Sequence, residues 1–182
     1  MKFLPENLEP NDLLKCLRDL SLEISQLLKS YNQNIKNTAE FQRQLNILNY
    51  DSGPVTKVDV EISEFVKKTI KERFPFSDWD FLSEEDVKNN KSKKFESKWV
   101  WIIDPIDGTK DFINQTGQFA VHIALLFEKK LILGAVPIPS KNQIWMSFEG
   151  RGTWCESKFK DSQITILNGS KELKNMTVLT SK

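Results

Sequence analysis

The sequence predicts an α+β fold, in which two N-terminal helices pack on one face of a mostly antiparallel sheet. Two observations lead to this prediction. Residues 13–31 and 58–70 carry apolar positions at helical spacing, whereas the apolar runs after residue 78 have the short lengths of strands. Strands that follow one another through tight turns pair antiparallel, and the preceding helices must bury an apolar face against the sheet.

The first helix is expected to begin at Pro10, and the second to end at Phe74 and Pro75. Side chains at three- and four-residue steps form one face of each helix. These are Leu13, Leu17, Leu20, Ile24, Leu27 and Tyr31 in the first helix, and Val58, Ile62, Phe65, Thr69 and Ile70 in the second. Residues 32–50 are rich in Asn and Gln and predict a loop with a short helix, followed by a turn at 51–54.

The rest of the chain predicts a series of strands. They are residues 79–82, 99–103, 119–127, 131–138, 143–148, 153–156, 163–167 and 176–179. The run 99–103 is apolar throughout, which predicts a buried strand. His122 lies inside the apolar run 119–127, and we expect it to pack in the core.

The composition excludes several classes of protein. The chain has 182 residues, a formal net charge of +1, 39% apolar and 28% charged residues, which is a globular profile with no electrostatic basis for nucleic acid binding. Its two cysteines form no paired motif and fit a reducing compartment. No segment has the length and apolarity of a membrane span or a signal peptide. We therefore expect a cytoplasmic protein without a membrane or nucleic acid partner.

The most informative segment is 101–110, in which an apolar strand runs into two aspartates and then Gly-Thr-Lys. Two carboxylates about 4 Å apart repel by about 4 kcal/mol at an effective dielectric constant of about 20. Asp104 and Asp107 therefore need a bound cation, a shared proton or a larger separation. Gly108 and Thr109 can begin a helix, whose free N–H groups bind phosphate. The segment predicts Mg²⁺-dependent phosphate chemistry, with a plain turn as the alternative.

Glu84 is the third candidate ligand, because it follows the predicted strand 79–82 as Asp104 follows the strand 99–103. If the two strands have the same polarity in one sheet, their ends converge. The carboxylates and the Ile106 carbonyl would then form an oxygen-rich site of the kind that Mg²⁺ and Ca²⁺ prefer. Zinc would require His or Cys ligands, and the chain has one His and no Cys-x-x-Cys pair. An exposed acidic turn is the alternative for Glu84.

Asp59 and Lys110 each allow both a functional and a purely structural interpretation. Asp59 lies near the start of the second helix, where the helix dipole favours a carboxylate whether or not it takes part in catalysis. Lys110 follows the Gly-Thr pair and is either a substrate contact or an exposed surface lysine.

The segment Asp104-Pro-Ile-Asp-Gly-Thr109 resembles the signature of the inositol monophosphatase superfamily of Mg²⁺-dependent phosphatases. Residues 53–59, Gly-Pro-Val-Thr-Lys-Val-Asp, and residues 81–85, Phe-Leu-Ser-Glu-Glu, agree with the family in the same order, and residues 118–125 resemble its next strand. The resemblance implies a sugar-phosphatase-like fold and a small phosphorylated substrate.

Within the superfamily, Ser-Glu-Glu and Gly-Thr-Lys-Asp-Phe are more similar to 3'(2'),5'-bisphosphate nucleotidases than to inositol phosphatases. This similarity implies hydrolysis of the 3'-phosphate of 3'-phosphoadenosine 5'-phosphate, a by-product of sulfate transfer, and hence a role in sulfur metabolism. The alternatives are an inositol monophosphatase or another sugar-phosphate phosphatase, and an inactive fragment or a non-catalytic half-domain that binds metal.

The resemblance also implies a role for each candidate residue. Glu84, Asp104 and the Ile106 carbonyl would hold a first Mg²⁺, and Asp104 and Asp107 would reach a second. Asp59 and Thr109 would form a hydrogen-bonded pair that orients the attacking water.

The remaining implied roles concern the substrate. The backbone N–H groups of Gly108 and Thr109 would hold the phosphate beside Asp107, and Lys110 would contact the substrate.

The resemblance further implies that the chain corresponds to the N-terminal part of such an enzyme. No Trp-Asp motif, which supplies the family's last metal ligand, follows Lys110. We expect an N-terminal α+β metal-binding phosphatase domain over residues 1–172 and the start of a largely absent C-terminal α/β domain over residues 173–182. Family members often form dimers, so the resemblance leaves a homodimer as one possible oligomeric state.

Overall fold

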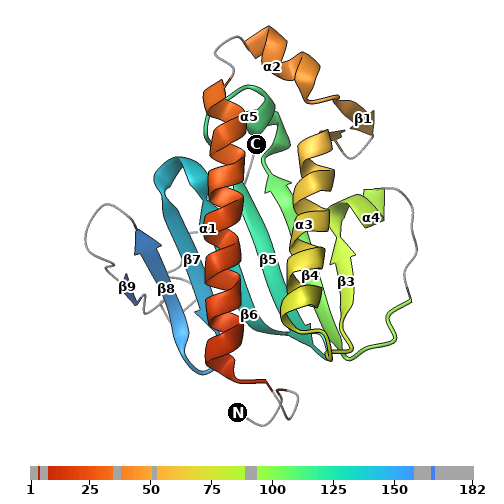
Figure 1. Ribbon diagram of the computed structural model, residues 1–182, viewed down its shortest axis with the longest axis vertical. Helices are drawn as coiled ribbons and strands as arrows, with labels where there is room; N and C mark the ends of the chain where they lie inside the picture. Colours follow the sequence, from red (N-terminus) through yellow and green to blue (C-terminus); the bar gives the residue numbers. More distant parts are fainter. Residues whose placement is uncertain are drawn as a thin grey trace, which may run out of the picture.

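The computed structural model describes residues 4, 8–34, 38–50, 53–88, 94–157 and 165–166. Two long helices lie across a seven-stranded sheet, which confirms the predicted α+β fold (Figure 1). The helices are α1 Pro10–Asn34, α2 Thr38–Gln44, α3 Lys57–Arg73, α4 Glu84–Lys88, α5 Thr109–Ile113 and the 3₁₀ turn η1 Pro139–Lys141. The strands are β1 Leu48–Tyr50, β2 Gly53–Val55, β3 Asp80–Ser83, β4 Trp99–Asp107, β5 Ala120–Phe127, β6 Lys130–Ile138, β7 Gln143–Phe148, β8 Gly152–Ser157 and β9 Thr165–Ile166.

The large sheet has the strand order β3-β4-β5-β6-β7-β8-β9, which is the order of the strands in the chain. Its first pair, β3 and β4, is parallel, and the other pairs are antiparallel. The predicted mostly antiparallel sheet is thus confirmed. Tight turns connect consecutive strands from β5 to β8, and such turns impose antiparallel pairing.

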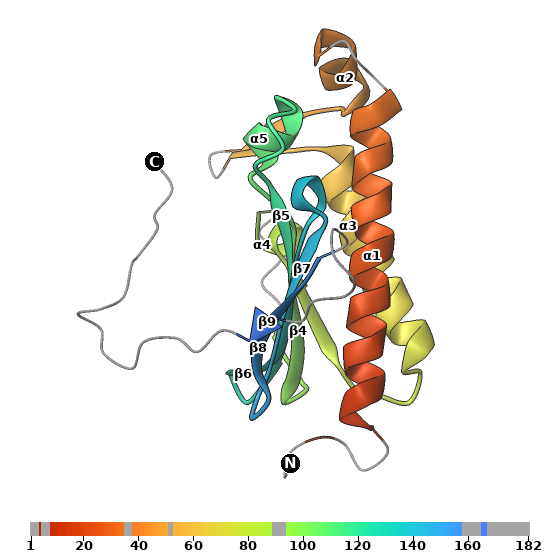
Figure 2. The same ribbon diagram turned by 90° about the vertical axis from the view of Figure 1, so that its left-hand side faces the viewer.

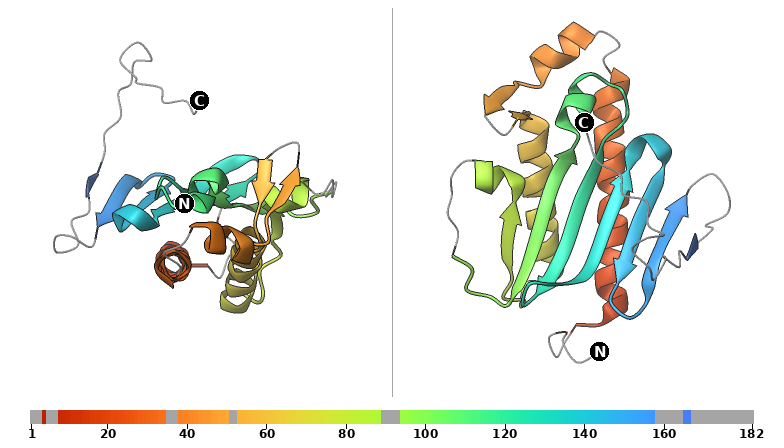
Figure 3. Two further views of the ribbon diagram at one scale, coloured as in Figure 1. Left: turned by 90° about the horizontal axis from the view of Figure 1, so that it is seen from above. Right: turned by 180° about the vertical axis from the view of Figure 1, so that it is seen from behind.

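Both long helices cover the same face of the sheet, as the side view shows (Figure 2). Seen from above, α1 and α3 lie side by side on that face, and the view from behind looks onto the opposite face (Figure 3). In the described part of the chain, no helix packs across that opposite face, which we call the open face.

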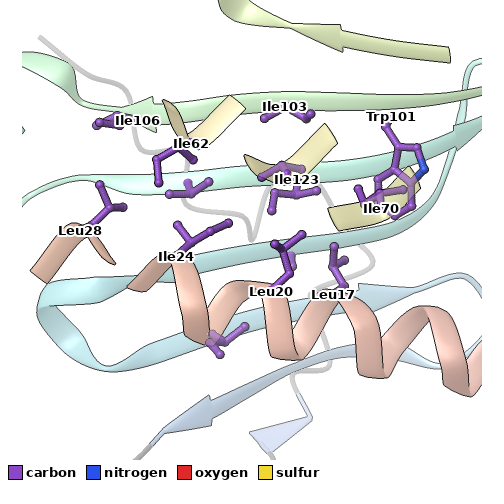
Figure 4. Close-up of a cluster of buried hydrophobic side chains, with 14 of the residues drawn as sticks. Leu17, Leu20, Ile24, Leu28, Ile62, Ile70, Trp101, Ile103, Ile106 and Ile123 are labelled. Atoms are coloured by element: carbon purple, nitrogen blue, oxygen red, sulfur yellow. The ribbon is translucent and has the colours of Figure 1, made fainter. Parts of the chain in front are cut away.

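The core lies between the two helices and the sheet (Figure 4). Helix α1 supplies an apolar stripe at three- and four-residue spacing, and α3 supplies a second one. The fully buried members include Leu17, Leu20, Ile24 and Leu28 of α1, Ile62 and Ile70 of α3, and Trp101, Ile103 and Ile123 of the sheet. Each buried side chain of this size stabilises the fold by about 1.5–3 kcal/mol.

Strand β4 is longer than the sequence predicted. We expected it to end at Ile103, but it continues through Pro105 to Asp107. Proline cannot donate a hydrogen bond within a sheet, and the β4–β5 register is irregular between Asp104 and Asp107, which accommodates it. The extension keeps both aspartates attached to the sheet.

The segment between the long helices also contains more structure than we expected. The short helix within residues 32–50 is confirmed as α2, and β1 and β2 form an additional two-stranded antiparallel sheet. The predicted strand at 176–179 and the predicted domain boundary after residue 172 lie outside the described residues. None of the described helices combines the length and apolarity needed to cross a membrane.

Candidate functional site

The parallel pairing of β3 with β4 brings two of the predicted ligands to one end of the sheet. Ser83, the last residue of β3, pairs with Ile103, so Glu84 and Asp104, the residues that follow this pair, lie at the same level of the sheet. The sequence prediction required the two strands to share a sheet and a polarity, and both conditions are met. In Figure 1, α5 and the start of α3 lie toward the same end of the molecule.

A capping arrangement fixes the turn that presents Glu84. The Ser83 N–H donates to the Asp86 carboxylate at 3.1 Å, and the Asp86 N–H donates to the Ser83 hydroxyl oxygen at 3.3 Å. Lys67 of α3 lies 3.2 Å from the same carboxylate. Burial alone would raise the pKa of Asp86, but the Ser83 hydrogen bonds and the Lys67 charge outweigh it, so the pKa lies below its usual value.

Strand β4 continues beyond Asp104 and ends at Asp107. The Asp107 side chain is 60% exposed, and its Oδ2 lies 3.6 Å from Nε2 of His122 on β5. We expected His122 to pack in the core, and this expectation is wrong, because 45% of its side chain is exposed. The alternation of β5 explains the difference, since Val121 and Ile123 on either side of His122 are the residues buried under the helices.

Gly108 makes the turn from β4 into α5. Its φ of +90° lies in the left-handed region, and a Cβ at this position would meet the Gln118 carbonyl oxygen at 2.8 Å. Aromatic contacts hold α5 in place, with the Phe112 ring 5.1 Å from Phe119 and 5.6 Å from Phe41. The turn after Asp107 therefore has a fixed path that only glycine fits.

Thr109 and Asp59 have well-defined partners. The Thr109 hydroxyl donates to the Ile106 carbonyl at 3.0 Å. Asp59 is fully buried at the start of α3, and its Oδ2 accepts from the Thr56 N–H at 2.7 Å and from the Thr56 hydroxyl at 2.6 Å. Thr56 and Asp59 thus form a capping box. The pairing of Asp59 with Thr109 is not among these hydrogen bonds and stays a prediction.

The donor types at this end of the sheet fit a hard cation. Glu84, Asp104 and Asp107 supply carboxylates and Ile106 supplies a carbonyl, all of them the oxygen ligands that Mg²⁺ and Ca²⁺ prefer. As they stand, no three Asp, Glu, His or Cys side chains among the described residues lie close enough together to hold a metal ion. The fold therefore brings the strand ends that carry the candidate ligands to one end of the sheet, but the carboxylates of the described residues are not close enough to form a metal coordination sphere.

The sequence analysis did not identify the roles of three residues at this site, Thr56, Asp86 and His122. Thr56 and Asp86 act as capping partners, and the spacings Thr-x-x-Asp and Ser-x-x-Asp are the signal that identifies them. His122 could be found from its alternation with Val121 and Ile123 on the predicted strand.

The comparison with protein families agrees with this arrangement. The family described as "Inositol monophosphatase family" matches residues 9–181. The chain belongs to this family. The family prediction from residues 53–59, 81–85 and 104–109 is therefore confirmed.

The relatives within the inositol monophosphatase family include two named activities. The chain is 32% identical over 133 residues to the 3'(2'),5'-bisphosphate nucleotidase CysQ of Haemophilus influenzae, covering 72% of this chain and 49% of that protein. It is 26% identical over 132 residues to inositol monophosphatase 1 of Rattus norvegicus, covering 72% and 47% respectively. The chain thus spans about half the length of these relatives.

The fold is also that of solved family members. The crystal structure of an IMPase/NADP phosphatase complexed with NADP and Ca²⁺ superimposes with a TM-score of 0.64 at 22% identity, covering 82% of this chain and 52% of that chain. At this identity, the likeness supports the fold alone.

Proposed function

We propose that this chain forms the metal- and phosphate-binding part of a Mg²⁺-dependent phosphomonoesterase. One observation carries the proposal. The parallel register of β3 and β4 brings Glu84 and Asp104 to one end of the sheet, with Asp107 and the Gly108 turn directly after them. Oxygen ligands next to backbone N–H groups suit a cation and a phosphate together.

The metal-binding roles follow from the chemistry of these donors. Glu84, Asp104 and the Ile106 carbonyl would hold one Mg²⁺, and Asp104 with Asp107 would reach a second. The Ile106 carbonyl already accepts from Thr109, but a carbonyl oxygen has two lone pairs and can serve both partners. When bound, Mg²⁺ would supply the positive charge that activates a water molecule and offsets the charge of the phosphate.

Asp59 and Thr109 are the proposed catalytic residues. A general base must be held in a fixed orientation, and Thr56 fixes the Asp59 carboxylate through two hydrogen bonds to Oδ2. The Thr109 hydroxyl donates to the Ile106 carbonyl in this structure, so it must rotate before it can pair with Asp59. In the proposed reaction, the Thr109 hydroxyl turns from Ile106 towards Asp59, and the pair orients the attacking water.

The substrate would lie beside the Gly108 turn. The N–H groups of Gly108 and Thr109 would hold the phosphate next to Asp107, and Lys110, an exposed side chain, would contact the rest of the molecule. The tight fit of Gly108 against Gln118 supports this assignment, because it fixes the path of the backbone that carries these N–H groups.

We infer that the substrate is 3'-phosphoadenosine 5'-phosphate, which would place the reaction in cytoplasmic sulfur metabolism. The support is the Ser-Glu-Glu and Gly-Thr-Lys-Asp-Phe segments together with the identity to CysQ, a 3'(2'),5'-bisphosphate nucleotidase. An inositol phosphate is the second candidate, because the rat inositol monophosphatase is also a relative. The solved structure with NADP and Ca²⁺ indicates that a related protein accepts a nucleotide and a divalent cation.

The test is phosphate release by the purified chain from 3'-phosphoadenosine 5'-phosphate and from inositol 1-phosphate, with and without Mg²⁺. We expect Mg²⁺-dependent release from the nucleotide and its loss in Asp104→Asn. Faster release from inositol 1-phosphate would overturn the substrate assignment. No release from either substrate by a folded chain would favour a half-domain that binds metal without catalysis.

A further inference from the structure

His122 is the only histidine in the chain and lies on the open face of the sheet. Its neighbours Val121 and Ile123 are buried at 0% and 1% exposure, whereas 45% of the His122 side chain is exposed. Adjacent residues of a strand point to opposite faces. The imidazole therefore does not belong to the core beneath the helices, and core packing does not account for its presence.

The β4–β5 pairing brings this imidazole to both aspartates of the candidate metal site. His122 is the direct cross-strand partner of Asp104, and residues paired in this way have side chains on the same face. The irregular register between Asp104 and Asp107 then brings Asp107 back towards β5. As a result, Nε2 of His122 lies 3.6 Å from Oδ2 of Asp107.

The contact matters because Asp107 is otherwise weakly held. Its side chain is 60% exposed, and within the described residues His122 is the only side chain with which the Asp107 carboxylate makes a polar contact. At 3.6 Å the pair is longer than a hydrogen bond, and a closure of about half an ångström would form one. Partners of this kind orient metal-binding carboxylates and sustain metal affinity.

We propose that His122 is a positioning residue of the metal site, which holds the Asp107 carboxylate in the orientation that binds the cation beside Asp104. Nε2 carries the hydrogen and donates it to Oδ2, so the imidazole acts through Asp107 and does not itself bind the metal. This inference rests on the proposed function, because it takes Asp107 as a metal ligand.

The first experiment tests the contact without any metal. Since the chain has one histidine, the ring C–H protons of His122 give a single resolved set of NMR signals. We expect Asp107→Asn to shift these signals and the control Asp111→Asn to leave them in place, because the Asp111 carboxylate accepts from Thr116 at 2.7 Å instead. Unchanged signals in Asp107→Asn would overturn the inference.

The second experiment measures Mn²⁺ affinity by titration calorimetry in three folded proteins: the unaltered chain, His122→Leu and His122→Gln. Leucine keeps the bulk of the side chain without a donor, whereas the glutamine Nε2 retains an N–H donor at a similar reach. We expect about tenfold weaker binding in His122→Leu and binding within about threefold of the original in His122→Gln.

The possible results separate the inference from the proposed function. If the chain binds Mn²⁺ and His122→Leu binds it equally well, His122 does not position Asp107, and the metal site stands without it. Equal losses in His122→Leu and His122→Gln would make the imidazole a direct ligand and overturn the positioning role. If the folded chain binds no Mn²⁺, the proposed metal site itself fails, and the inference falls with it.

Discussion

Gly108 is a single residue whose backbone conformation determines where the proposed phosphate-binding N–H groups lie. Two independent constraints act on it, a left-handed φ of +90° and the Gln118 carbonyl oxygen 2.8 Å from where a Cβ would lie. The first constraint disfavours any L-residue, and the second requires the backbone itself to move. Because the proposed phosphate N–H groups sit on this turn, a shift here would displace them as well as destabilise the fold.

We predict that Gly108→Ala lowers the free energy of unfolding by more than about 2 kcal/mol, since about 1 kcal/mol of conformational strain adds to the clash. Gly150→Ala is the matched control, because Gly150 also has a left-handed φ, +77°, but has no atom within 4 Å of the added Cβ. It should cost about 1 kcal/mol. Urea unfolding of both variants measures the difference, and equal losses would show that the Gln118 contact costs nothing.

For Asp104 and Asp107, the sequence specifies the residue types and their spacing, but not the contacts that the folded sheet gives them. Their type and spacing predict an oxygen site for a hard cation, and that site stays a prediction. The approach of His122 to Asp107 depends on an irregular register between two strands, and register is set by the pairing of distant residues. Local periodicity does not contain that information.

At the scale of elements, the turn from β3 into α4 determines where Glu84 lies. Asp86 holds this turn through the Ser83 hydrogen bonds, and Lys67 ties it to α3. Asp86 thus binds three elements together, although it is not itself a candidate ligand. Its lowered pKa means that the ionised carboxylate is the form that stabilises the fold.

We predict that Asp86→Asn lowers stability by about 1 kcal/mol at pH 7, as the loss of a charged capping group does. The folded pKa of Asp86 lies below the unfolded value of about 3.9, so its contribution is present above that pH and is lost as the pH falls further. Urea unfolding from pH 7 to pH 3 should therefore show the variant and the original chain converging at the acidic end.

Glu64→Gln is the control for the Asp86 prediction. Glu64 also pairs with Lys67, at 3.1 Å, but its side chain is 68% exposed, and exposed pairs contribute little. We expect Glu64→Gln to change stability by less than about 0.5 kcal/mol. A gap between Asp86→Asn and the original chain that stays constant down to pH 3 would contradict the role of the ionised carboxylate.

The sequence predicted the long elements well and the short ones poorly. Helices α1 and α3 carry four or more turns of regular apolar spacing, and this periodicity is a strong local signal. The β1–β2 pair has three residues in each strand, too few to show an alternation. The continuation of β4 through Pro105 was missed because proline normally excludes a central strand.

At the scale of the whole molecule, the core and the site occupy different parts of the same sheet. The buried stripes of α1 and α3 pack on the helix-covered face, and the three candidate carboxylates, Glu84, Asp104 and Asp107, lie at the end of β3 and β4 and are not part of that core. Substitution of a ligand should therefore leave the fold intact. This separation makes metal binding measurable through stability, without any assay of catalysis.

We predict that Mg²⁺ raises the melting temperature of the chain. A ligand that binds only the folded state, at about 100 times its Kd, stabilises by about 2.7 kcal/mol, or about 5–10 °C for a domain of this size. Asp104→Asn should keep the melting temperature of the metal-free chain but lose the Mg²⁺ response, because it removes a ligand that we propose both ions share, and no core contact. NaCl at equal ionic strength controls for screening. The same rise in Asp104→Asn, or with NaCl, would mean that the stabilising ion binds elsewhere than at the end of β3 and β4.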